Sequence, residues 1–202
     1  RVNRAKFAGR WYASDPRRLS RELDRYLGEA QTQTPPPTAA ILPHAGLSFS
    51  GPGMAEAFRN INPSTIEHAL VLAPSHYVRL QPDTLYVDSF DSHETPLGEI
   101  RGAPDFWKSS GVAGDEAIEM EHGAELFFPF LRHRVKPEAR LSVALVPELT
   151  SMSAVEGAAD TVFERLEGSA GARRTLIIVS SDFTHYGGGF RFTPFGGYPL
   201  ER

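Results

Sequence analysis

Cysteine is absent from all 202 residues of the chain. Neither a disulfide nor a thiolate metal site can form from these residues, and the absence fits a reducing compartment, so we expect a cytoplasmic protein. Long apolar runs are missing too, because no stretch reaches the roughly 18 apolar residues that a membrane-spanning helix needs. Neither sign of charge is in large excess. The net charge is −4, which gives no indication of the basic surface that nucleic-acid binding requires. We therefore expect neither a membrane protein nor a nucleic-acid-binding one.

Several catalytic motifs are also missing. The chain has no Walker loop, no dinucleotide fingerprint, no G-x-S-x-G elbow and no H-E-x-x-H helix. The glycine-rich segment Ser50-Gly51-Pro52-Gly53 is predicted to begin a helix. Its N–H groups would suit an anion there, but tight-turn geometry is the better explanation of the glycines.

Short apolar runs alternate with helical patterns along the chain. Strands are predicted at residues 39–42, 69–72, 141–146 and 176–179, and helices over 16–28, around 54–60, over 115–134 and over 154–166. Ser14 or Asp15 would cap the first helix, and Pro129 is expected to bend or break the third. Residues 31–38 form a proline-rich connector, and residues 192–202 have the composition of a loop. The alternation indicates one α/β domain over 1–202, with a mixed, largely parallel sheet covered on both faces.

Three of these strands end in a polar segment that carries a histidine. The strand 39–42 is followed by His44, the strand 69–72 by His76, and the strand 176–179 by Asp182 and His185. In open α/β sheets ligands bind just beyond the carboxyl ends of the strands, so these three segments are predicted to converge on one polar site. Imidazoles and a carboxylate gathered there suit a divalent metal or proton-transfer chemistry.

Each of these residues also has a structural interpretation. His44 and His76 are either metal ligands or hydrogen-bonded loop histidines. Asp182 and His185 lie three residues apart and can share a helical turn, so the carboxylate would orient the ring as a base or ligand, unless Asp182 only caps a turn. His122 projects from the predicted helix 115–134 as an acid, a base or a substrate contact, or as a buried structural residue. His93 is expected at the surface, and His68 and His133 receive no role.

Six segments resemble the Memo-like family, relatives of the class III extradiol ring-cleaving dioxygenases, and they occur in that family's order. They are Ala8-Gly9-Arg10-Trp11-Tyr12 with Asp15-Pro16; Pro43-His44-Ala45-Gly46 with Ser50-Gly51-Pro52; Pro74-Ser75-His76; Glu94-Thr95-Pro96-Leu97-Gly98; Glu121-His122 with Pro129-Phe130; and Ser180-Ser181-Asp182-Phe183-Thr184-His185-Tyr186-Gly187.

The resemblance implies a three-layer α/β/α fold like the catalytic subunit of those dioxygenases. It also implies a pocket in which His44, His76 and His185 match metal-site histidines, with Asp182 and His122 as catalytic residues beside them. Iron or copper is the implied metal. Bacterial and archaeal relatives are named as protein B of the AmmeMemoRadiSam system, which implies a functional association with radical SAM and AMMECR-type proteins.

This chain departs from the family pattern in two places. Many relatives carry a second histidine directly after the one matching His76, where this chain has Tyr77. The family also continues past the segment that contains His185, and its later part supplies a cysteine or acidic ligand. We therefore expect 1–202 to be a Memo-like domain truncated at its C-terminal end.

Two functions follow as hypotheses. The first is a metal-dependent, dioxygenase-like oxidoreductase in which His185, oriented by Asp182, acts as acid or base. The second is a non-catalytic protein that uses the same histidine pocket for a peptide, a small molecule or an anion. Metal-assisted hydrolysis is a third possibility that no residue favours.

Overall fold

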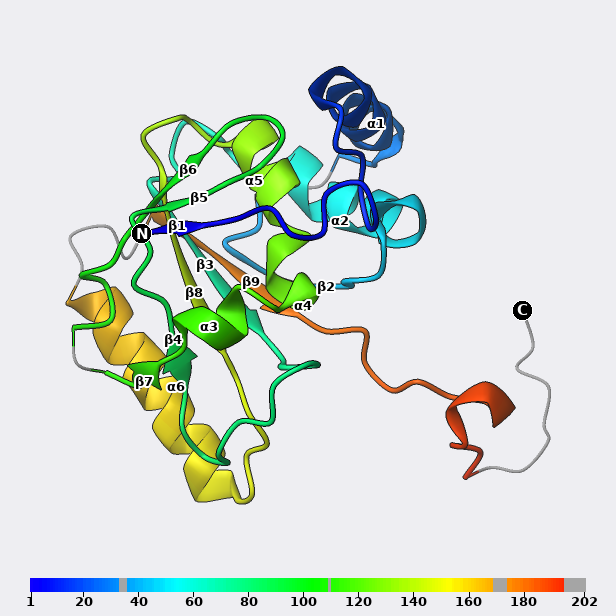
Figure 1. The fold of residues 1–202 in the computed structure, drawn as a ribbon. Helices are drawn as coiled ribbons and strands as arrows, with labels where there is room; N and C mark the ends of the chain where they lie inside the picture. Colours follow the sequence, from blue (N-terminus) through cyan, green and yellow to red (C-terminus); the bar gives the residue numbers. More distant parts are fainter. Residues whose placement is uncertain (33–35, 109, 169–173, 195–202) are drawn as a thin grey trace.

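The computed structural model describes residues 1–32, 36–108, 110–168 and 174–194. Within these ranges one sheet has the strand order β1-β5-β6-β8-β3-β9-β2, with β4 paired to β8 and β7 paired to β4 (Figure 1). The strands are β1 (Val2–Asn3), β2 (Ala39–Leu42), β3 (His68–Ala73), β4 (Tyr86–Val87), β5 (Ser92–His93), β6 (Ile100–Gly102), β7 (Val112–Ala113), β8 (Arg140–Leu145) and β9 (Thr175–Ser180).

The sheet is mixed and largely parallel, as the sequence predicts. Its central strands β6, β8, β3, β9 and β2 all run in the same direction, and the antiparallel pairs are β5 with β6 and β4 with β8. The predicted strand at 69–72 is confirmed and extended by one residue at each end. Because parallel strands end at the same edge, the segments that follow β2, β3 and β9 leave the sheet together.

Helices cover both faces of the sheet. They are α1 (Pro16–Glu29), α2 (Leu47–Asn60), α3 (Asp115–Ile118), α4 (His122–Glu125), α5 (Phe128–Arg134) and α6 (Met152–Glu167). Val71 of β3 belongs to the large core cluster under α1, α2 and α5, whereas its neighbour Leu70 packs in a second cluster with Val162 of α6. Successive side chains of a strand point to opposite faces, so α6 covers the face opposite the other helices. The α/β expectation is confirmed.

Two predicted helices differ from those observed. The helix expected around 54–60 begins at Leu47, so the segment Ser50-Gly51-Pro52-Gly53 lies inside α2 instead of starting it. The helix expected over 115–134 is divided into α3, α4 and α5, and the extended backbone at Glu121 separates α3 from α4. Pro129 lies in the first turn of α5, where its missing N–H is tolerated. Asp15, by contrast, caps α1 as predicted: its Oδ1 accepts from the backbone N–H of Arg18.

His93 is completely buried, which corrects the expectation that it lies at the surface. Its Nε2 is 3.1 Å from Oδ2 of buried Asp88, and its Nδ1 is 3.3 Å from the side-chain nitrogen of Asn3. Asp88 also accepts from Trp107 and from the backbone of Val143. Buried polar groups need such partners. Asn3, Trp107 and Val143, which pair with His93 or with Asp88, are all distant from His93 in the sequence, so the local sequence does not show them.

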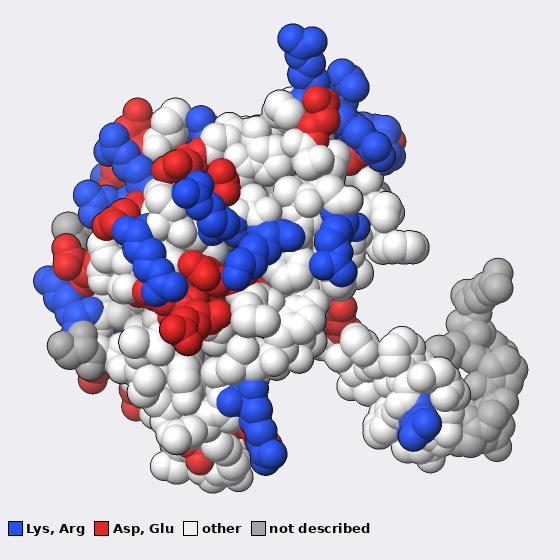
Figure 2. Space-filling view, in the orientation of Figure 1, with Lys and Arg blue, Asp and Glu red and all other residues white. Residues whose placement is uncertain are grey.

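Charged side chains of both signs share the surface. On the face shown in Figure 2, Lys and Arg side chains alternate with Asp and Glu. No helix in the described ranges combines the length and the apolar character needed to cross a bilayer. Of the predicted proline-rich connector, residues 33–35 lie outside the described residues, as do residues 195–202 of the predicted C-terminal loop.

The close packing of α1 on α2 gives a first prediction. A Cβ at Gly51 would lie 2.6 Å from Cε2 of the buried Tyr26 ring, so Gly51→Ala forces an overlap. Overpacking of this kind costs about 1–3 kcal/mol, and we expect the free energy of unfolding to decrease by that amount. Gly53→Ala, two residues further along α2, places its Cβ 3.5 Å from Cγ of Pro43 and is expected to stabilise through helix propensity. Equal urea midpoints for the two variants would contradict this packing.

Candidate metal centre

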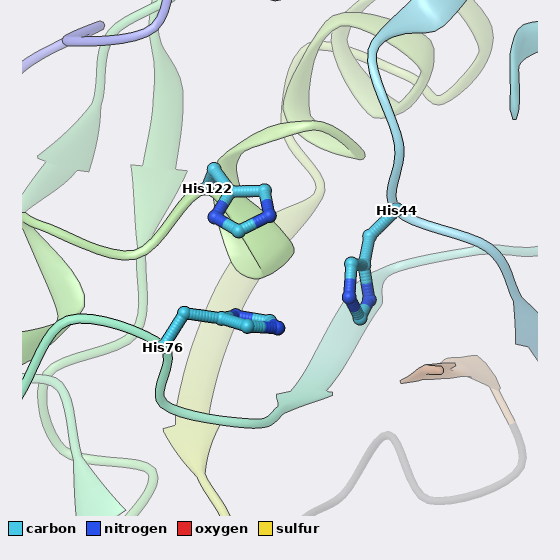
Figure 3. Close-up of side chains that lie close together, drawn as sticks. All are labelled: His44, His76 and His122. Carbon is cyan, nitrogen blue, oxygen red and sulfur yellow. The ribbon is translucent and has the colours of Figure 1, made fainter. Parts of the chain in front are cut away.

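Three histidines meet at the carboxyl edge of the sheet. His44 follows β2, His76 follows β3, and His122 is the first residue of α4. Their ring centroids are 5.0 Å apart for His44 and His76, 5.5 Å for His44 and His122, and 4.6 Å for His76 and His122. One nitrogen from each ring lies within 4.8 Å of the others, and the rings surround a common space (Figure 3).

The buried carboxylate of Glu121 organises two of these rings. Its Oε1 accepts from Nδ1 of His76 at 2.8 Å and from the backbone N–H of Gly123 at 2.7 Å, and it lies 3.2 Å from Nδ1 of His122. Its Oε2 accepts from the backbone N–H of His76 at 2.6 Å. Burial alone would raise the pKa of Glu121, but the His122 ring and the donors from His76 and Gly123 outweigh it and lower the pKa to about 2. Glu121 is therefore ionised at neutral pH and can only accept.

Ser180 fixes the third ring in the same manner. Its hydroxyl donates to the carbonyl oxygen of Gly123 at 2.6 Å and lies 2.7 Å from Nδ1 of His44. The single hydroxyl proton is already used, so Nδ1 of His44 carries the proton and donates to Ser180. Burial lowers the pKa of His44, and with the neighbouring His76 and His122 rings it outweighs the opposing charges of Asp182 and Glu121.

The consequence is the same for all three imidazoles. Nδ1 of His44 and of His76 is hydrogen-bonded to an oxygen, and Nδ1 of His122 lies 3.2 Å from Glu121 without a hydrogen bond. A proton on Nδ1 is therefore favoured in each ring, and each Nε2 keeps its lone pair. This is the arrangement that orients histidine ligands in metal sites, where the ring nitrogen away from the metal donates to a carboxylate or another oxygen. Among the described residues, this trio is the one group of histidines and acids placed to hold a metal ion.

Aromatic side chains border the histidine trio on one side. Trp11 lies 4.2 Å from His122 between ring centroids, Tyr77 lies 5.4 Å away, and Phe7 lies 5.8 Å away. Phe7 and Tyr77 are themselves stacked at 6.2 Å. We call Phe7, Trp11 and Tyr77 the aromatic wall; Tyr77 stands half exposed at its rim.

Glu125 holds the N-terminal segment that carries Phe7 and Trp11. This buried carboxylate accepts from the backbone N–H groups of Lys6 and Phe7 and, at 2.6 Å, from the hydroxyl of Tyr12. Burial raises the pKa of Glu125, and burial together with the Glu125 charge raises the pKa of Tyr12. Two of the three aromatic side chains are thus positioned by a residue one helical turn after Glu121.

Comparison with known proteins shows the family of the chain. Residues 3–199 match the family described as Memo-like protein. The chain belongs to the Memo-like family. It is similar to Protein MEMO1 of Xenopus tropicalis (32% identity over 196 residues) and of Homo sapiens (29% over 196 residues), each covering 94% of this chain and 64% of the relative. Protein memo-1 homolog of Caenorhabditis elegans is 30% identical over 202 residues, which is 95% of this chain and 55% of the relative. This Memo-like chain therefore spans less than two thirds of the length of these relatives.

The structure brings together His44 and His76 of the predicted ligand set, and it adds His122, which the sequence reading placed beside them as an acid or base. His185 lies outside the trio. The Memo-like chain leaves the sheet after β9 as an extended arm (Figure 1), on which the His185 ring is half exposed and packs 4.9 Å from Phe190.

Asp182 lies between the trio and the arm. Its Oδ2 is 3.7 Å from Nε2 of His44 and 3.8 Å from Nε2 of His185, and its Oδ1 accepts from the backbone N–H of His44 at 2.7 Å. The predicted pairing of Asp182 with His185 is therefore present, and the same carboxylate also reaches His44. No turn of helix joins Asp182 to His185, because residues 181–186 are irregular.

The sequence reading assigned no role to Glu121, Gly123 or Ser180 of this Memo-like site. A Cβ at Gly123 would lie 3.0 Å from Oε1 of Glu121 and 3.4 Å from Oγ of Ser180, so glycine is needed for the close approach. A signal was present: Glu121-His122-Gly123 places a capping carboxylate directly before a histidine. The helical spacing of the surrounding residues concealed it.

The low pKa of Glu121 predicts an acid-dependent loss of stability. Its pKa falls from 4.5 to about 2 on folding, so its stabilising contribution is complete above pH 4.5 and disappears as the pH falls toward 2. For this buried group the shift corresponds to about 3 kcal/mol. In Glu121→Gln the amide nitrogen must face a donor, because both carboxylate oxygens accept N–H groups. We expect wild type to exceed the variant in free energy of unfolding at pH 6, and the difference to shrink at pH 3.

Urea titrations at both pH values measure this difference. Glu116→Gln, at an exposed position on α3, is the matched control and should follow the wild-type profile. A difference between wild type and Glu121→Gln that is the same at pH 6 and pH 3 would refute the assignment.

Proposed function

We propose that this Memo-like chain binds one transition-metal ion through Nε2 of His44, His76 and His122. One observation supports the proposal: one nitrogen from each ring lies within 4.8 Å of the others. Because the three Nδ1 atoms face Ser180 and Glu121, we assign the ion to Nε2 of each ring. Imidazole nitrogen suits iron, copper, zinc and nickel better than calcium or magnesium. Nδ1 of His122 is buried without a hydrogen bond, and a metal on the opposite nitrogen would strengthen its N–H as a donor toward Glu121.

The different exposure of the three histidine rings also suits a ligand site. His44 and His122 are buried, at 4% and 6% exposure, whereas His76 lies at the open side. Two rings are thus held rigidly while the third borders solvent, which gives an ion or a substrate a route of entry. The aromatic wall meets the same space and provides an apolar surface for a flat group.

Iron or copper is the metal proposed here, together with dioxygenase-like oxidation. When bound, such an ion would supply redox chemistry and open positions for a substrate and O₂. The protein residues would have separate tasks. Glu121 and Ser180 hold the rings, the aromatic wall orients a planar substrate, and Asp182 and His185 exchange a proton at Nε2 of His185. The cytoplasmic location and the association with radical SAM and AMMECR-type proteins stay predictions.

A binding role without catalysis is the second candidate, and the aromatic wall favours it. Trp11, Tyr77 and Phe7 present rings beside the trio, as sites that hold aromatic or peptide groups do. His185 stands on an exposed arm, so the acid–base residue of the first candidate is held less firmly than the trio. Oxygen uptake by the iron- or copper-loaded protein on catechol-type substrates would distinguish the enzyme, whereas binding of a catechol without uptake supports the second candidate.

Metal content tests the ligand set. We expect the protein reconstituted with Fe(II) or Cu(II) to retain about one ion per chain, and His44→Ala, His76→Ala and His122→Ala each to lose it, because three nitrogens are needed for a tight site. Glu121→Gln should weaken metal affinity about 10–100-fold by releasing two rings. Elemental analysis after desalting provides the measurement.

Two further variants make the test decisive. His133→Ala removes a histidine that contacts Asp24 away from the trio, and it should retain the metal. His185→Ala should retain it too under the assignment to His122. Metal loss from His185→Ala together with retention by His122→Ala would replace His122 by His185 as the third ligand.

A further inference from the structure

One part of the sheet has no helix over it. Val179 of β9 pairs with Leu72 of β3 and with Ile41 of β2, so these three side chains point to the face that α6 covers. Leu72 packs in the cluster that includes α6, whereas Ile41 is 55% exposed. Sheets of parallel strands are ordinarily covered on both faces, and among the described residues α6 is the one helix on this side. The uncovered area therefore lies over β9 and β2.

The side of α6 that faces this area is apolar as well. The other side of α6, which carries Gly157 and Thr161, borders a cavity together with residues 83–85, which lead into β4. Figure 1 likewise shows α6 next to β4 and β7. Because successive helix residues are about 100° apart, Val155 and Phe163 point away from that cavity, toward β9 and β2. They are 43% and 60% exposed, so this side of α6 has no partner among the described residues.

The two surfaces form a notch with the width of one helix. Neighbouring strands lie about 4.8 Å apart, so β9 and β2 together offer roughly 10 Å. An α-helix with its side chains has a diameter of about 10 Å. The sheet forms the floor of this notch and the apolar side of α6 forms one wall. Exposed apolar side chains grouped in this manner are typical of an interface, not of a free surface.

The connections between the parallel strands indicate which segment can fill the notch. The chain passes from β2 through α2 to β3, and α2 lies on one face; it passes from β8 through α6 to β9 in the opposite direction along the sheet, and α6 lies on the other face. Both crossovers thus have the same hand, as right-handed crossovers in one sheet require. A connection from β9 to the free edge of β2 would run in the direction of the α6 crossover. Its helix would therefore lie on the α6 face, over β9 and β2.

We propose that a segment following Arg202 in the full-length protein fills this notch with an amphipathic helix, which packs beside α6 on β9 and β2. The relatives have enough chain for it, since the match covers 64% of Protein MEMO1 of Xenopus tropicalis and leaves more than a third of that protein outside. The proposal uses no residue of the histidine trio, so it is independent of metal binding.

Hydrogen exchange of the full-length protein, as its gene encodes it, and of residues 1–202 tests whether the notch is covered. We expect the backbone amides of α6 and β2 to exchange at least about tenfold more slowly in the full-length protein, because packing against a further helix suppresses local opening. The amides of α1, which lies on the opposite face, are the internal control and should exchange at the same rate in both forms.

Phe163→Ala tests the contact itself. In residues 1–202 the Phe163 ring is exposed, so the variant should unfold at the same or a slightly higher urea concentration, because alanine favours the helix. In the full-length protein the ring should be buried, and its loss should lower the urea midpoint by about 1 M. Met120→Ala removes an exposed methionine outside the notch and should shift the midpoints of both forms equally.

Several results would overturn the proposal. Equal exchange of α6 in the two forms would do so, as would an unchanged urea midpoint of full-length Phe163→Ala or a gene that ends at Arg202. Protection of α6 in residues 1–202 that increases with protein concentration would assign the notch to a second copy of the chain instead. The urea midpoint of full-length Phe163→Ala decides the question even if residues 1–202 fail to fold alone.

Discussion

The ionised carboxylate of Glu121 is the constraint on which the rest of the site depends. A carboxylate without a proton can only accept hydrogen bonds, so every group that touches it must present a donor. It receives the backbone N–H groups of His76 and Gly123 and the Nδ1 side of two imidazoles. One buried acid thereby fixes the loop after β3, the start of α4 and the proton position on His76, and its charge favours a proton on the nearby Nδ1 of His122. The metal proposal follows from those proton positions, because they leave Nε2 of each ring free.

The sheet and the short helix α4 supply the remaining geometry. Strand β9 lies between β3 and β2, so Ser180 at its end stands between the loops that carry His76 and His44. Ser180 bonds both His44 and the carbonyl of Gly123, which connects the sheet edge to α4. Glu125, four residues after Glu121, holds the N-terminal segment and with it Phe7 and Trp11 of the aromatic wall. Two buried glutamates on one turn thus perform separate tasks, one orienting ligands and the other positioning the surface beside them.

Much of this arrangement follows from the sequence, and the parts that do not have physical reasons. The apolar runs at 39–42 and 69–72 predict parallel strands, and parallel strands bring His44 and His76 to one edge. The place of His122 in the trio could not be read in the same manner, because the helical spacing over 115–134 conceals the extended backbone at Glu121. His185 was expected in the trio because it follows a strand, but the segment after Asp182 continues outward as an arm. His93 looked like a loop residue because Asn3, one of its two partners, lies 90 residues away in the sequence, and because nothing local shows that Asp88, its other partner, is itself buried.

The tautomers of the three histidines provide the most direct test of the account. Long-range ¹H–¹⁵N correlation NMR on ¹⁵N-labelled, metal-free protein at neutral pH distinguishes a protonated Nδ1 from a protonated Nε2 in each ring. We predict a proton on Nδ1 and an unprotonated Nε2 for His44, His76 and His122. A proton on Nε2 of His76 in the neutral ring would contradict the account, because Nδ1 would then confront Glu121 with a lone pair and the nitrogen facing the common space would be blocked.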